Sequence, residues 1–360
     1  MPPSQASSGP PWLPMVWALG GKAEKNIDVP ITAVLLVFYV CGAATHMTIF
    51  QLNRRRGHKF LFSAVLFGFC MARTVTCILR IASVCLPHNI RLAIAASIFV
   101  AAGVLLIFVI NLVFAQRLLR AAHPHFGWHR TFSLALKALY VLIVLTLAIV
   151  ITGTVESFYT LRPRTRKIDR SLQLYGATFL AIISFLPIPM VIFGLLVPRK
   201  TRVEKFGQGR FRTKVIVLLA AAFSVTLGAW YRCGTSWKTP VPRTEPLPGY
   251  FSRACFYVFN FVVEIIVVYL YAILRIDLRF HIPDGAKGPG SYAAGQTQNG
   301  EEEKPQRQLS RVYTEEETFD DVEDEDVPRS GDAEKKSAST PKQPPIDEEK
   351  AIGGDNKQTI

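Results

Sequence analysis

The chain has 360 residues, of which 50% are hydrophobic and 19% are charged, and its formal net charge is +14. Residues 301–360 carry 18 acidic and 9 basic side chains, whereas residues 1–300 carry 9 acidic and 32 basic ones. An apolar, basic body joined to an acidic end excludes a single water-soluble globular domain, and no nucleic-acid partner is expected.

Seven stretches are long and apolar enough to cross a bilayer as a helix, which takes about 20 residues. They are 30–52, 60–84, 92–115, 132–154, 172–197, 214–231 and 251–275. The pattern predicts an all-α integral membrane protein with a seven-helix transmembrane domain over 30–281, after a short extracellular segment over 1–29. Prolines at 187 and 189 predict a kink in the fifth helix. The polar, acidic residues 282–360 predict a disordered cytosolic tail.

The distribution of lysine and arginine predicts the orientation. The first, third and fifth loops and the segment after the last helix hold more positive charge than the other side, so the positive-inside rule places them in the cytosol. The first loop, "NRRRGHK" (53–59), counts most toward this orientation, because early loops usually dominate membrane insertion. The basic stretch "RPRTRKIDR" (162–170) lies on the opposite side and weakens the bias. We therefore expect the N-terminus outside, the C-terminus in the cytosol, and the plasma membrane as the location.

The second stretch carries two arginines seven residues apart, which places both on one helix face. Arg80 lies about 10 Å nearer the outer surface and can reach the headgroups. Arg73 lies near mid-membrane, where a charge costs roughly 2.5–3.5 kcal/mol and needs a partner. Glu264 is the only acidic residue within a predicted span. We expect one buried ion pair between Arg73 and Glu264, with Asn260 one turn away, serving either helix packing alone or ligand binding.

Several other polar residues are weaker candidates. Asn111 and His46 are further candidates for the interior polar network. Cys85 and Cys233 fall in predicted outer loops, where a disulfide could form. The histidines of "HPHFGWHR" (123–130) favour an interfacial loop rather than a metal site, because proline and glycine separate them and no carboxylate is near. With no paired carboxylates in a helix, we expect no enzyme, cofactor or metal.

The predicted cytosolic side offers two regulatory features. The fifth loop, residues 198–214, holds seven basic residues and one acidic residue. It fits anionic lipid headgroups or an acidic protein partner, although positive-inside bias alone also accounts for much of it. In the tail, Arg307 precedes Ser310 by three residues, and acidic residues follow Thr314 and Thr318, so these three are candidate phosphorylation sites.

Three stretches carry a resemblance to a known family. They are residues 28–80, "FVAAGVLLIFVINLVFAQRLLRAAHPHFGWH" (99–129) and "VEIIVVYLYAILRIDLRFHIPDGA" (263–286). Over roughly residues 25–285 the chain resembles fungal seven-helix membrane proteins of unknown function, which are often labelled family C-like G-protein-coupled receptors. The resemblance implies the seven-helix architecture. The third helix ends in "AQRLLR" rather than Asp-Arg-Tyr, so the receptor label rests on topology.

These observations favour one function and leave two others open. We expect a receptor-like sensor that binds a small ligand near Arg73 and Glu264 and signals through basic loops, with a heterotrimeric G protein as a candidate partner. The alternatives are a small-molecule or lipid transporter, for which the buried charge would hold an anionic substrate, and a membrane scaffold. The lipid bilayer is the surrounding partner in each case.

Overall fold

The computed structural model describes residues 9–12, 14–57, 59–198, 203–283, 285–286 and 288–292. The predicted tail beyond residue 292, with Ser310, Thr314 and Thr318, lies outside the described residues, as do residues 199–202 of the basic loop. The described part is all-helical, apart from one isolated bridge between Val16 and Pro242.

Seven helical units among the described residues are long and apolar enough to span a membrane. They are α1 (Lys25–Arg55), α2 (Leu61–Cys85), α3 and α4 (Ile90–Gly103 and Leu105–Ala122), α6 (Arg130–Tyr159), α7 and α8 (Pro163–Phe185 and Pro187–Leu196), α9 (Phe211–Trp237), and α10 with α11 (Arg253–Tyr257 and Val263–Ile273). The short helices α5 (Pro124–Gly127) and α12 (Ile276–Arg279) and the 3₁₀ turn Gly249–Phe251 complete the set. The predicted membrane-protein class is confirmed.

Two of the seven units are broken, and one is irregular. The break between α7 and α8 lies at Pro187, as predicted from the loss of a backbone hydrogen bond at proline. The break between α3 and α4 follows Gly103 and was not predicted. Between α10 and α11 the chain forms a π-helix, η2 (Val258–Val262), a rare element that is often found at functional sites.

Several helices extend beyond the predicted spans. α1 begins at Lys25 rather than 30, α7 begins at Pro163 rather than 172, and α9 ends at Trp237 rather than 231. Hydropathy marks the part of a helix that lies in hydrocarbon, whereas the backbone ladder continues into the polar layer. As a result Asp28, Asp169 and Arg232 lie inside helices, and the expectation of a single helical carboxylate at Glu264 was wrong.

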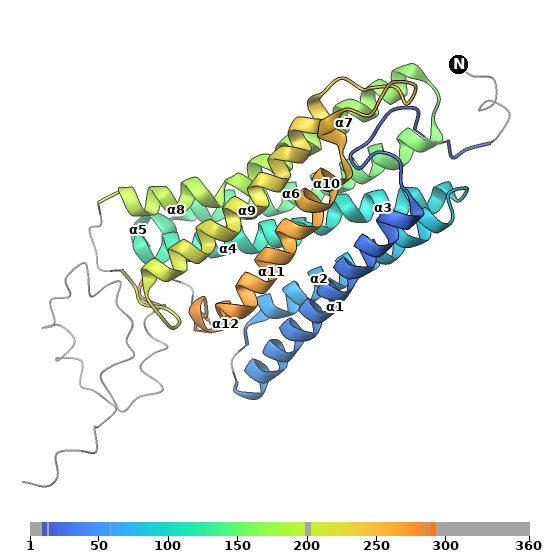
Figure 1. Cartoon of the computed structure of the whole chain (residues 1–360). Helices are drawn as coiled ribbons and strands as arrows, with labels where there is room; N and C mark the ends of the chain where they lie inside the picture. The colour runs from blue at the N-terminus through green and yellow to red at the C-terminus, as the bar shows by residue number, and fades with distance from the viewer. Residues whose placement is uncertain are drawn as a thin grey trace, which may run out of the picture. The chain divides into compact units, whose positions relative to one another are not determined.

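The helices pack so that the first and last ones are neighbours. α1 packs on α2 and on α11, α9 packs on α7, α11 and η2, and α4 packs on α2, α8 and α9 (Figure 1). α4 is enclosed along most of its length, whereas α6 exposes apolar side chains such as Leu134 and Val144. An apolar exposed face of this kind suits contact with lipid tails. Most of the buried polar residues lie on α1, α2, α9 and the segment from η2 to α11, which position the candidate site.

Candidate functional site

The inner face of α1 carries a polar residue every seven positions. Each one forms a hydrogen bond with a residue between α10 and α12, 222 to 225 positions further along the chain, and we call this row the α1 seam. Its contacts are Thr32 Oγ1 to Tyr257 Oη at 3.1 Å, Tyr39 Oη to the Phe261 carbonyl at 3.1 Å, His46 Nε2 to the Val268 carbonyl at 3.1 Å, and Asn53 Nδ2 to Asp277 Oδ2 at 2.7 Å. Interhelical hydrogen bonds in membranes contribute about 0.6 kcal/mol each. The seam fixes the register of α1 against α11.

Arg73 and Glu264 form the predicted ion pair. Arg73 donates from Nε to Glu264 Oε2 at 2.6 Å and from Nη2 to Oε1 at 2.5 Å, a bidentate geometry. The Arg73 side chain is 0% exposed and that of Glu264 is 2% exposed. The rings of Phe69 and Phe261 lie 5.8 and 5.6 Å from the Arg73 guanidinium carbon. Both ions are thus withdrawn from solvent and lipid.

The end of α3 completes the shell around Arg73. Arg73 Nη1 donates to the carbonyls of Val100 at 3.0 Å and Phe99 at 3.4 Å. The last four carbonyls of a helix lack an intrahelical donor, and α3 ends at Gly103, so the Val100 carbonyl is available and the Phe99 carbonyl lies one residue before this group. A Cβ at Gly103 would lie 3.0 Å from Arg73 Cζ. Glycine at this position therefore makes room for the guanidinium.

Arg232 is a second arginine on the same carboxylate, and it lies one residue beyond the predicted end of the sixth span. Its Nη1 lies 3.8 Å from Glu264 Oε1 and donates to Asn260 Oδ1 at 3.3 Å. The Asn260 amide donates to the Phe256 carbonyl at 2.8 Å, and Asn260 lies within η2. We call Arg73, Arg232, Asn260 and Glu264 the central cluster. Two arginines share one carboxylate there, so the cluster has one excess positive charge.

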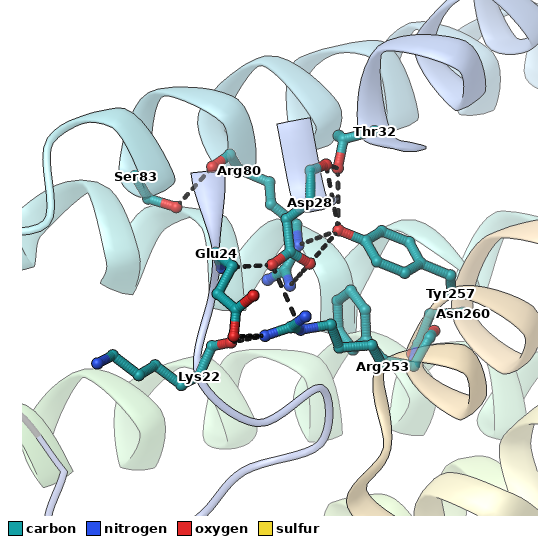
Figure 2. A network of polar contacts seen from close by, with 10 residues as sticks. Lys22, Glu24, Asp28, Thr32, Arg80, Ser83, Arg253, Tyr257 and Asn260 are labelled. Atoms are coloured by element: carbon teal, nitrogen blue, oxygen red, sulfur yellow. Dashed lines mark hydrogen bonds and ion pairs between the residues drawn. The ribbon is translucent and has the colours of Figure 1, made fainter. Parts of the chain in front are cut away.

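A second buried cluster surrounds Asp28, near the start of α1 (Figure 2). Asp28 is fully buried, and Tyr257 donates to its Oδ1 at 2.7 Å. Arg80 Nη2 lies 3.6 Å from Oδ1, and Arg253 Nε lies 3.7 Å from Oδ2. Arg253 also pairs with Glu24 at 2.5 Å, and this hydrogen bond lowers the pKa of Glu24. We call these five residues the Asp28 cluster.

The position of Arg80 differs from two expectations: that it anchors at the headgroups, and that the bundle has one buried ion pair. Its side chain is 17% exposed, and its guanidinium carbon lies 4.1 Å from the centre of the Phe256 ring and beside Asp28. It therefore binds inside the bundle rather than anchoring at the headgroups. The bundle also has more than the one buried ion pair that we expected. The missed carboxylate, Asp28, lay two residues before the predicted start of the first span.

The remaining sequence candidates do not join the central cluster. Asn111 is buried on α4 and accepts from Tyr271 Oη, and His46 belongs to the α1 seam. Cys85 and Cys233 are free thiols, so the disulfide is not formed. The reason is that α9 continues past Cys233, which is buried against Thr178 of α7 (Sγ to Oγ1, 3.7 Å) rather than in an outer loop.

Two signals in the sequence could have revealed the missed residues. The seven-residue spacing of Thr32, Tyr39, His46 and Asn53 along α1 is one. The other signal is a charged residue at the edge of an apolar stretch. Asp28 lies just before the apolar part of α1, and Arg232 lies just after the apolar part of α9. A charged side chain near the end of a span can point into the bundle when an oppositely charged or hydrogen-bonding partner lies there.

The comparison with protein families gives one partial match. Residues 210–281 match a family model described as "Protein of unknown function (DUF3112)". The matched segment includes α9, η2 and α11, and therefore Arg232, Asn260 and Glu264 of the central cluster, but neither Arg73 nor the Asp28 side of α1. No curated protein and no solved structure matches the chain. The fold and composition define an integral membrane protein with seven candidate spanning helices.

Proposed function

We propose that the protein is a non-enzymatic, receptor-like sensor of a small anionic ligand. The observation that carries this proposal is the excess positive charge of the central cluster. Arg232 has only part of the Glu264 carboxylate and its side chain is 21% exposed, whereas Arg73 is fully buried and binds both carboxylate oxygens and two carbonyls. A carboxylate or phosphate on a ligand can complete the coordination of Arg232. A ligand group beside Arg232 also competes with Asn260 and Glu264 for its donors.

Ligand binding at Arg232 would act on the packing of two helices. Arg232 lies on α9, and its present partners Asn260 and Glu264 lie on η2 and α11. α9 begins at Phe211, so the last residues of the basic stretch 198–214 form the first turn of this helix. A change in the contact between α9 and η2 therefore has a direct helical route to that loop. Such a switch requires the ligand to bind one arrangement of the helices better than the other.

The orientation predicted from the positive-inside rule completes the sensor proposal. The Asp28 cluster would face the outside, and the basic loop 198–214 would face the cytosol and bind anionic lipid headgroups or a heterotrimeric G protein. One basic residue of that loop is committed elsewhere, because Lys214 is buried and donates to the Phe206 carbonyl at 2.5 Å.

The test is a binding assay on full-length protein in phosphatidylcholine nanodiscs. A panel of small carboxylates and phosphates is screened by thermal shift, and the affinity of each hit is measured for Arg232→Gln. We expect at least about a tenfold loss of affinity, the worth of one charge-assisted hydrogen bond. Arg170→Gln is the matched control, because Arg170 is a half-buried arginine outside the central cluster that donates to the Ser236 and Lys238 carbonyls. Equal losses in both variants, or no hit in the panel, would contradict the proposal.

A transporter is the second candidate, and the α1 seam favours it. The seam places hydrogen-bonding groups from Thr32 to Asn53, a length of about 32 Å by the helical rise and thus close to the hydrocarbon thickness. Chains of such groups mark substrate or proton pathways in many membrane proteins. Uptake of the bound anion into sealed proteoliposomes distinguishes the two functions. Uptake that His46→Leu abolishes would favour transport, whereas binding without uptake would favour the sensor.

A further inference from the structure

A basic pocket lies at the end of the bundle opposite the Asp28 cluster. It has a volume of about 400 Å³ and lies between the link from α1 to α2, the last two turns of α4, and the segment that follows α12. The volume is within the range of small-molecule sites, about 300–1,000 Å³. Neither the central cluster nor the Asp28 cluster contributes a residue to it.

Four basic side chains line this pocket: Lys59, Arg117, Arg120 and His281. No Asp or Glu is among its described lining residues. Arg117 and Arg120 are three positions apart on α4 and so share a face of that helix. The pocket thus concentrates positive charge at a concave surface, and a concave surface of one sign attracts ions of the other.

The two arginines are held by neutral groups alone within the described part of the chain. Arg117 donates to the Phe280 carbonyl at 2.5 Å, and its guanidinium carbon lies 4.7 Å from the centre of the Phe62 ring. Arg120 donates to the Gly127 carbonyl at 3.1 Å and to Ser133 Oγ at 3.2 Å. Arg120 also contacts Tyr292 and lies with its guanidinium carbon 4.4 Å from the centre of the Trp128 ring, so its fork is held in place. A guanidinium has five N–H donors, and the hydrogen bond of Arg117 to Phe280 orients its fork while leaving donors for a ligand.

We propose that this pocket binds a phosphate-bearing group. A phosphate offers several acceptor oxygens and up to two negative charges, which match two guanidinium forks and an ammonium better than a single carboxylate does. The pocket lies where α1 and α4 end and α2 begins, at the level of the helix ends. Leu61, at its edge, is 67% exposed, an apolar side chain that suits contact with lipid. The phosphate could belong to a lipid headgroup or to a soluble compound.

The experiment uses full-length protein and measures both sources. In the first arm, phosphatidylcholine nanodiscs with and without phosphatidylinositol bisphosphate are compared by thermal stability and by native mass spectrometry of retained lipid. In the second arm, inositol trisphosphate and inorganic phosphate are titrated into protein in pure phosphatidylcholine nanodiscs. Binding in the first arm alone identifies a lipid, and binding in the second arm alone identifies a soluble phosphate compound. Binding in both arms supports the pocket for the phosphorylated headgroup that the two share, and the tighter binder identifies the source. Binding in neither arm would overturn the proposal.

Variants tie the binding to the pocket. We expect Arg117→Gln to lower the affinity about tenfold or more, because one charge-assisted contact is lost. Lys59→Gln gives the same test at an exposed side chain, where folding is not at risk. Arg55→Gln is the matched control, because Arg55 is an exposed arginine at the same end of α1 but does not line the pocket. Equal effects of Arg55→Gln and the pocket variants would show general surface attraction and would refute the site.

Discussion

At the residue scale, Arg73 uses nearly every kind of partner available to a guanidinium. It is surrounded by the Glu264 carboxylate, by two carbonyls near the end of α3, and by two aromatic rings. These contacts offset the free energy that is needed to remove the guanidinium from water. A buried charge without partners has no such compensation. Arg232 has fewer partners, and this inequality between two arginines on one carboxylate is what makes the central cluster asymmetric.

The asymmetry predicts unequal effects of neutralising each partner. Removing one member of a buried pair costs about 3–5 kcal/mol. We expect Glu264→Gln to cost more than Arg73→Gln, because it leaves two arginines without a carboxylate, whereas Arg73→Gln leaves Glu264 beside Arg232. The double neutral variant should be more stable than Glu264→Gln. The free energies of unfolding of the two single variants and the double variant are measured in mixed micelles, with circular dichroism as the signal.

The half-buried Arg170, outside the central cluster, again supplies the control for these variants. Arg170→Gln should change the free energy of unfolding by no more than about 0.5 kcal/mol. A reciprocal exchange of Arg73 and Glu264 is a poorer test, because it would set an arginine at 264 against Arg232. The opposite order of the two single variants would show that Arg232 takes no share of the carboxylate.

Asp277, at the other end of the bundle, predicts a pH dependence. Burial alone would raise its pKa, but hydrogen bonds from Arg275 and Asn53 outweigh that effect, and the pKa lies below its ordinary value of 3.8. A folded-state pKa below the unfolded one stabilises the fold above pH 3.8, and this contribution is lost as the pH falls through the folded-state pKa. Asp277 therefore favours the fold at neutral pH.

Replacing Asn53 tests this linkage. In Asn53→Ala the folded-state pKa of Asp277 rises, so the variant should be less stable than the wild type at neutral pH by about 1–3 kcal/mol. The two stability curves should approach each other as the pH falls below 3.8 and through the lowered folded-state pKa of Asp277, below which the carboxyl is protonated in both proteins. Denaturant unfolding between neutral and acidic pH measures both curves. A gap that stays constant over the whole range would assign the loss to packing alone.

At the element scale, the π-helix η2 is fitted closely against α9. A Cβ at Gly228 of α9 would lie 2.7 Å from the Phe259 carbonyl oxygen, and a backbone atom cannot move aside as a side chain can. Tyr231, one turn further along α9, stacks on Phe259 with the ring centres 4.0 Å apart. The approach of the two backbones brings Arg232 within reach of Asn260.

Gly228→Ala should therefore separate α9 from η2. We expect a loss of about 1–3 kcal/mol in the free energy of unfolding, the usual cost of overpacking, together with weaker ligand binding at Arg232. Gly234→Ala on the same helix is the control, because a Cβ there meets nothing within 4 Å. Similar stability of the two variants would mean that the close approach carries no strain.

The elements differ in how far the sequence predicts them. The seven apolar runs and the Pro187 break follow from local composition, and the Arg73–Glu264 pair follows from the need of a mid-membrane charge for a partner. The break after Gly103 has no local signal, because Arg73 stabilises it from another helix by binding the Phe99 and Val100 carbonyls. η2 likewise depends on packing against α9. Arg232 and Asp28 were missed because hydropathy ended their helices too early.

At the scale of the whole molecule, the orientation in the membrane can be tested directly. The chain has no Asn-x-Ser/Thr sequence. Any N-glycosylation that is detected therefore comes from an acceptor that has been added. We expect an acceptor on a spacer before residue 1 to be glycosylated in a eukaryotic host, and the same acceptor after residue 360 to remain unmodified. The positive charge of the loops is the physical reason. The reverse pattern would place the Asp28 cluster on the cytosolic side.

The α1 seam also has a consequence for biosynthesis. The partners of Thr32, Tyr39, His46 and Asn53 lie 222 to 225 residues further along the chain. At a translation rate of roughly 5–20 residues per second, α1 waits about 10 to 45 s for them. During that interval its hydrogen-bonding face must be covered by the insertion machinery or by a chaperone. The cell's quality control could therefore recognise an unfinished or truncated chain by the uncovered face of its first helix.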